Sequence, residues 1–186
     1  FIVVAPDHVG NTFLDYDASR KPEMITRRPL DIRAAYDQLL SESELTDCID
    51  RDAGYAVAGH PFGGYTSVAL SGAELDPEAI FSHCNTYGGW LCDEVALLIE
   101  GQGDAVMDFT DERVWAGIPM APAAYEVLVG GLQNVDVPML VMGGGRDTST
   151  AMSWSVEPIY NGMSQTQRWL LDIFEAGHAT FSNACD

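Results

Sequence analysis

The stretch YAVAGHPFGGYTSVALSG, residues 55–72, decides the fold. Its first five residues form a short apolar run, which is typical of a strand buried on both faces of a parallel sheet. Gly59 and Gly63 follow with the spacing of a G-x-S-x-G turn, in which Pro61 takes the place of the serine. The small residues over 62–72 predict a helix that packs closely behind the strand. The stretch therefore predicts a strand–turn–helix unit.

Strands and helices alternate along most of the remaining chain. Further apolar runs predict strands at residues 1–5, 114–123 (the end of which is a loop), 137–147 and 168–174. Helices are predicted over residues 29–40, with Pro29 at the first turn, and around 152–163, whereas residues 6–27 are predicted to form a polar loop. This alternation predicts an α/β fold for one domain over residues 1–186: a mainly parallel sheet with right-handed crossovers and flanking helices.

Residues 74–112 interrupt this alternation and are predicted to form a cap or an excursion over the sheet edge. They contain Cys84 and Cys92, which could close a disulfide if the protein is exported, although unpaired thiols fit the sequence equally well. The other cysteines are Cys48 and Cys185, and no C-x-x-C pair is present. The sequence therefore predicts no metal site, and it gives no sign of a cofactor.

Charge is the strongest signal in the composition. The chain contains 28 Asp and Glu residues but only 9 Lys and Arg residues, which gives a net charge of −19. Nucleic acid and anionic lipid bind through Lys and Arg, so neither is an expected partner. The acids are scattered along the chain, which favours a solvated surface over an acidic functional patch. No apolar run is long enough for a membrane span.

Three positions that are candidates for a functional site lie at the ends of three predicted strands. Pro61 follows strand 55–59, Asp147 ends strand 137–147, and His178 follows strand 168–174. Because the carboxyl ends of parallel strands meet at one edge of a sheet, these positions are predicted to lie together. Simpler roles remain open, since Asp is common in turns and a loop histidine is often satisfied by a local hydrogen bond.

The remaining histidines are less persuasive candidates. His8 is predicted to be structural, His60 occupies a variable position before Pro61, and His83 lies beside Cys84.

The chain order of turn, acid and histidine resembles that of the α/β-hydrolase superfamily, and more narrowly of the dienelactone-hydrolase-like esterases. Besides residues 55–72, the matching stretches are VVAPDHVGNT (3–12), RPLDIRAAYDQLL (28–40), VPMLVMGGGRD (137–147) and EAGHATFSNAC (175–185). In that family two or three strands, and the loop with the first oxyanion-hole donor, precede the strand that residues 1–5 represent. The resemblance therefore implies that this chain is a fragment of such a domain.

The resemblance also implies a function and site roles. It implies a serine carboxylic-ester hydrolase without a cofactor, acting on a small ester through an acyl-enzyme. His178 would be the general base, Asp147 would orient it, and the N–H of Phe62 would be an oxyanion donor. Many members of the family are exported.

Pro61 departs from the family at the nucleophile position. Proline has no hydroxyl or thiol, and its ring fixes φ near about −65°, so it cannot adopt the strained backbone of the nucleophile turn. The turn is therefore predicted to relax, with Pro61 as a first helical residue and the Phe62 N–H redirected. We expect a chain that is inactive, or nearly so, as an esterase. The alternative is a non-catalytic binding or scaffold subunit with a protein partner.

Overall fold

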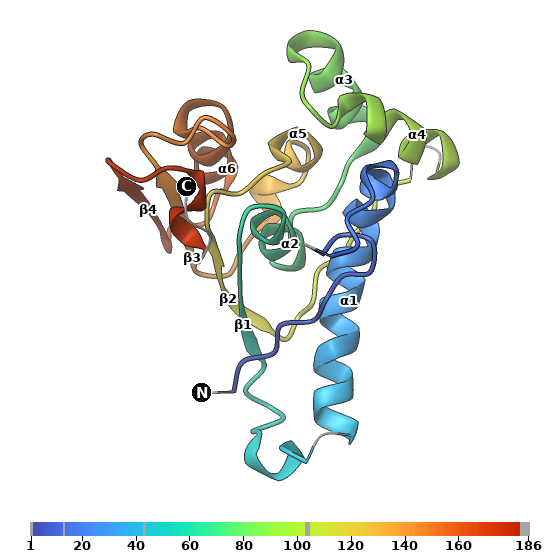
Figure 1. The fold of residues 1–186 in the computed structure, drawn as a ribbon, viewed down its shortest axis with the longest axis vertical. Coiled ribbons are helices and arrows are strands. Elements are labelled where there is room, and N and C mark those ends of the chain that lie inside the picture. The colour runs from blue at the N-terminus through green and yellow to red at the C-terminus, as the bar shows by residue number, and fades with distance from the viewer. Residues whose placement is uncertain (1, 13, 43, 103–104, 183–186) are drawn as a thin grey trace.

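The protein has an α/β fold, as predicted. A computed structural model describes residues 2–12, 14–42, 44–102 and 105–182. Its four strands form one parallel sheet in the order β1-β2-β3-β4 (Figure 1). The strands are β1 (Tyr55–Gly59), β2 (Val114–Pro119), β3 (Met139–Gly144) and β4 (Arg168–Ile173). Each predicted strand after residue 50 is therefore present, with ends trimmed by a few residues.

Helices flank the sheet and extend beyond it. They are α1 (Lys21–Glu42), α2 (Phe62–Leu70), α3 (Pro77–Tyr87), α4 (Cys92–Gln102), α5 (Tyr125–Leu128) and α6 (Glu157–Gly162), which follows the π-helical turn η4 (Met152–Val156). Short 3₁₀ turns are η1 (Ala18–Arg20), η2 (Thr46–Cys48), η3 (Leu132–Asn134) and η5 (His178–Phe181). Helix α2 packs on β1 and β2, with α1 against it, while η4 and α6 pack on β3 and β4. None of the described helices is long and apolar enough to cross a bilayer.

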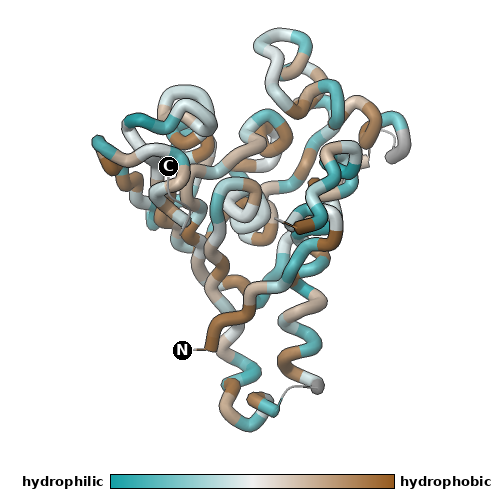
Figure 2. The backbone as a smooth tube through the Cα atoms, in the orientation of Figure 1, coloured by the Kyte–Doolittle hydropathy of each residue, from teal (hydrophilic) through white to brown (hydrophobic). Residues whose placement is uncertain are grey.

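The prediction of a strand at residues 1–5 is wrong for the described residues 2–5, and residue 1 lies outside them. Residues 2–5 form no strand, and the side chain of Val3 is 85% exposed. Figure 2 shows this apolar segment on the outside of the molecule next to the N-terminus. An apolar run becomes a strand only where a neighbouring strand completes its hydrogen bonds, and none of the described strands pairs with it.

The first helix is longer than predicted. It starts at Lys21 rather than at Pro29, so the proline lies inside α1 and part of the predicted 6–27 loop is helical. Pro29 has no N–H, so the carbonyl of Ile25 loses its helical partner. The hydroxyl of Tyr65 in α2 donates to this carbonyl at 2.8 Å. Both Ile25 and Tyr65 are fully buried, and this contact satisfies the group that the proline leaves unpaired.

Residues 74–112 leave the sheet and return to nearly the same place. Leu75 and Met107 exchange two backbone hydrogen bonds of 2.9 Å at the base of the segment. Between them lie α3 and α4, which Figure 1 shows apart from the sheet. A disulfide joins Cys84 and Cys92 across the loop between these helices. Cys48 is an exposed free thiol, and Cys185 lies outside the described residues.

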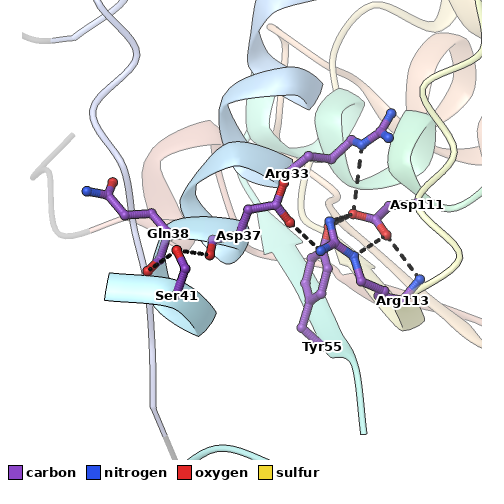
Figure 3. Close-up of polar contacts among 7 residues, drawn as sticks. All are labelled: Arg33, Asp37, Gln38, Ser41, Tyr55, Asp111 and Arg113. Atoms are coloured by element: carbon purple, nitrogen blue, oxygen red, sulfur yellow. Dashed lines mark hydrogen bonds and ion pairs between the residues drawn. The ribbon is translucent and has the colours of Figure 1, made fainter. Parts of the chain in front are cut away.

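A polar network ties α1 to the amino ends of β1 and β2 (Figure 3). Asp111 is buried and accepts hydrogen bonds from Tyr55 at 3.0 Å and from the guanidinium of Arg113 at 2.7 and 2.8 Å. Arg113 also contacts Asp37 of α1, and Arg33 approaches Asp111 to 4.0 Å. Although burial opposes it, these hydrogen bonds hold the pKa of Asp111 below its usual value. The network lies at the amino ends of the strands, opposite their carboxyl ends.

The substitution Tyr65→Phe tests whether the Tyr65 hydroxyl compensates for the helical hydrogen bond that Pro29 removes from α1. We expect it to lower the free energy of unfolding by about 1–3 kcal/mol, because a buried carbonyl loses its donor. Urea denaturation measures this change, with Tyr16→Phe at an exposed position as a control expected to change stability by less than about 0.5 kcal/mol. In a Pro29→Ala background the helical N–H is present again, so Tyr65→Phe should lower the free energy of unfolding by less. Equal losses in both backgrounds would contradict the compensation.

Candidate functional site

The turn after β1 is held by backbone contacts. Pro61 has helical dihedral angles, φ −76° and ψ −37°, and caps the N-terminus of α2. Its carbonyl accepts hydrogen bonds from the N–H groups of Gly64 at 3.1 Å, Tyr65 at 3.3 Å and Ala123 at 2.9 Å. The turn is thus continuous with the helix, as the proline ring requires. It is not the strained turn in which a nucleophile elbow presents its side chain.

Two glycines let this turn pack tightly. A Cβ on Gly59 would lie 2.5 Å from the carbonyl carbon of Gly63, and one on Gly64 would lie 2.8 Å from the Cα of Pro122. Backbone atoms cannot yield to such contacts, so no larger residue fits at either position without moving the helix or the 120–124 loop. The glycine spacing therefore has a packing reason that is independent of any chemistry.

Asp147 lies in the loop after β3 and is buried. Its Oδ1 accepts hydrogen bonds from the N–H groups of Ser149 at 2.8 Å and Thr150 at 2.9 Å. Its Oδ2 lies 2.9 Å from the Thr150 hydroxyl and 2.8 Å from Nδ1 of His178. Burial alone would raise the pKa of Asp147, but these hydrogen bonds outweigh it and hold the pKa below its usual value. The carboxylate is therefore charged at neutral pH.

His178 begins η5 in the loop after β4. The backbone holds this loop against the one that carries Asp147, because the N–H of Arg146 donates to the carbonyl of Ala176 at 3.0 Å. A Cβ on Gly144 would lie 2.4 Å from the same carbonyl oxygen, so glycine is needed for this approach. The contact with Asp147 uses Nδ1, which leaves Nε2 as the ring nitrogen that can exchange a proton with a substrate.

His60 packs on the Asp147–His178 pair, which the sequence did not suggest. Its ring centroid lies 4.6 Å from that of His178 and 5.8 Å from that of Phe181. Burial and, to a smaller extent, the charge of His178 lower the pKa of His60. Its buried Nε2 has no hydrogen-bond partner among the described residues. His60 is therefore a neutral imidazole at neutral pH, packed at a tilt against the histidine that contacts Asp147.

The structure thus brings together two of the three predicted positions and sets the third beside them. Asp147 and His178 are in direct contact, and Pro61 follows the histidine that packs on His178. Phe62 begins α2, so its N–H has no acceptor within the helix. His8 bonds to Asp31 of α1 at 2.8 Å.

Thr150 was missed by the sequence reasoning, although a signal for it exists. The run Asp147-Thr-Ser-Thr150 is typical of a turn in which an aspartate accepts hydrogen bonds from the residues two and three positions later. The contact between His60 and His178 has no such signal, because it joins loops 118 residues apart in sequence (178 − 60).

A pocket of about 310 Å³ lies in front of the turn. His60, Pro61 and Phe62 line one part of it, and Lys21 and Arg28 of α1 line another. The Arg28 guanidinium donates to Asn11 at 2.7 Å and to Thr66 at 3.2 Å. Burial lowers the pKa of Arg28 to about 10, so it is still a cation at neutral pH. Among the described residues, no cluster of His, Cys, Asp and Glu is arranged to hold a metal ion.

No protein-family model matches the chain, and no curated protein is significantly similar to it. The contacts of Asp147, His178 and the Pro61 turn are therefore the basis on which a function can be assigned.

The substitution Asp147→Asn tests the charge of this carboxylate. The folded pKa is lower than the unfolded one, so ionisation of Asp147 stabilises the fold above the usual carboxyl pKa of about 3.9. That contribution is lost as the pH falls through the folded pKa. We expect Asp147→Asn to cost about 1–3 kcal/mol at pH 7 and progressively less below about pH 4.

Denaturation in urea over a series of pH values measures this cost. Asp136→Asn, at an exposed position, is the matched control and should change stability by less than about 0.5 kcal/mol. A cost for Asp147→Asn that does not change with pH would contradict the charged hydrogen bonds assigned to Asp147.

Proposed function

We propose that the β1–α2 turn, Asp147 and His178 form the frame of a serine carboxylic-ester hydrolase of the dienelactone-hydrolase-like type, and that Pro61 leaves this frame without its nucleophile. The observation that carries the proposal is the 2.8 Å contact between Oδ2 of Asp147 and Nδ1 of His178. It joins the loops after β3 and β4, and His60 connects it to the turn after β1. Catalytic groups in open parallel sheets gather at this end of the strands.

The chemistry of such a frame assigns one role to each group. A serine oxygen at position 61 would bond to the carbonyl carbon of a small ester, while Nε2 of His178 takes the serine proton. The alcohol then leaves with that proton, and a water activated by His178 hydrolyses the acyl-enzyme. Asp147 would orient the imidazole and stabilise its charged form, and the Phe62 N–H would donate to the oxyanion.

Pro61 blocks the first of these steps, because it has no oxygen that could form the acyl bond. Its helical backbone also belongs to a relaxed turn rather than to an elbow. We therefore expect the chain to be inactive, or nearly so, as an esterase.

A non-catalytic binding or scaffold subunit is the second candidate. It is favoured by the packing of His60 on His178, since a neutral imidazole against the base serves no step of acyl transfer.

Restoring a hydroxyl at position 61 tests the first candidate. We expect the unmodified protein to give neither a burst nor turnover with p-nitrophenyl acetate. Pro61→Ser should hydrolyse the ester at least about tenfold faster than Pro61→Ala, its matched control. This gain is a modest part of the roughly 10²–10⁴-fold that a positioned general base contributes. Adding His178→Ala to Pro61→Ser should remove the gain. Mass spectrometry should find a serine-directed phosphonate on position 61 of Pro61→Ser alone.

Two outcomes would contradict the proposal. If Pro61→Ser hydrolyses the ester no faster than Pro61→Ala, the turn is not a hydrolase elbow. If the unmodified protein turns over the ester and the phosphonate blocks it, the chain contains a nucleophile other than the one assigned.

A further inference from the structure

A larger pocket of about 630 Å³ shares Trp90 with the pocket in front of the turn. Four of its lining residues are aromatic: Tyr87 and Trp90 from the loop between α3 and α4, Tyr125 from α5 and Trp154 from η4. Its volume is within the range of small-molecule sites. None of its lining residues is Lys or Arg. The walls therefore offer electron-rich ring faces, together with the imidazole of His83 and with Lys21 over the Trp90 ring.

Glu126 places a carboxylate in the wall of this pocket. Its side chain belongs to α5 and the residue is only 3% exposed. Oε1 accepts a hydrogen bond from the N–H of Leu91 at 3.0 Å. Oε2 has no donor among the described residues, and no described Lys or Arg forms an ion pair with this carboxylate.

The loop that carries Tyr87 and Trp90 is fixed against this carboxylate. The Cys84–Cys92 disulfide closes the loop, and a Cβ on Gly89 would lie 2.9 Å from Oε1 of Glu126. The disulfide and this close approach therefore restrict where Tyr87 and Trp90 lie relative to the carboxylate.

We propose that this pocket binds an organic cation of the quaternary ammonium class. A cation over an aromatic face is attracted by the ring electrons. Glu126 supplies the opposite charge, and the net charge of −19 raises the local concentration of cations. The proposal does not rest on the proposed esterase frame, because none of the aromatic residues or Glu126 belongs to it.

The chemistry of the walls selects this class over other cations. A divalent metal ion requires several oxygen or nitrogen ligands, whereas this pocket offers one carboxylate and no metal-binding cluster is present among the described residues. A quaternary ammonium has no N–H to satisfy, so ring faces and one carboxylate are sufficient. The indole of Trp90 already accepts one cation: Nζ of Lys21, whose charge Glu94 offsets at 3.5 Å, lies 5.0 Å from its centroid.

Titration calorimetry with choline as the probe tests the proposal. Its neutral isostere, 3,3-dimethylbutan-1-ol, has the same shape without the charge. We expect saturable one-to-one binding of choline and at least about tenfold weaker binding of the alcohol, which corresponds to the loss of about 1.4 kcal/mol. His178→Ala should leave choline binding unchanged, which separates this site from the esterase frame.

Two substitutions assign the binding to the pocket. Glu126→Gln keeps an oxygen that accepts from the Leu91 N–H. It should weaken the binding of choline at least about tenfold and leave the binding of the alcohol unchanged. Trp154→Leu removes one ring face at a half-exposed position and should weaken the binding of choline at least about threefold. Trp115→Leu, a tryptophan outside the pocket, is the matched control and should leave binding unchanged. Urea midpoints confirm that each variant is folded.

Three results would overturn the proposal. These are equal affinity for choline and the alcohol, choline binding that survives Glu126→Gln and Trp154→Leu, and no saturable heat with millimolar choline. If Glu126→Gln does not fold, Trp154→Leu and the isostere comparison still decide the question.

Discussion

Close backbone contact at the β1–α2 turn is the constraint on which the rest of the structure depends. Gly59 lies against Gly63, Gly64 lies against Pro122, and the Pro61 carbonyl joins the helix to the 120–124 loop. That loop contains Ala121 and Ala124 at positive φ, a conformation that costs alanine roughly 1 kcal/mol or more and persists only where the surroundings hold it. Helix α2 is thereby fixed on the sheet, and the Tyr65–Ile25 hydrogen bond fastens α1 to α2.

A second set of backbone contacts holds Asp147 and His178 together. The loops after β3 and β4 meet through Arg146 and Ala176, and Asp147 orients His178 across this junction. Nothing in these contacts requires a nucleophile at position 61. These contacts are therefore compatible with a proline at that position, whereas the acyl transfer proposed for a serine there is not. Under the proposed function, this separation explains why the Asp147–His178 contact exists beside a turn whose residue 61 has no hydroxyl.

The sequence predicted what local patterns determine. Continuous apolar runs identified β1 to β4, and the rule that parallel strands end at one edge brought Asp147 and His178 together. It failed where a distant partner decides the outcome. Residues 2–5 have the composition of a strand but no strand beside them, and Pro29 is tolerated inside α1 only because Tyr65 supplies a donor. The packing of His60 on His178 and the burial of Glu126 depend on segments far apart in sequence, so no spacing could reveal them.

The most direct test of the central claim is the geometry of position 61 once the proline is removed. A crystal structure of Pro61→Ser should show residue 61 at positive φ, His60 displaced from His178, and the new hydroxyl oxygen within about 3.2 Å of Nε2 of His178. A residue 61 that keeps its helical dihedral angles, with the His60 ring still packed on His178 and the hydroxyl directed away from the imidazole, would contradict the account.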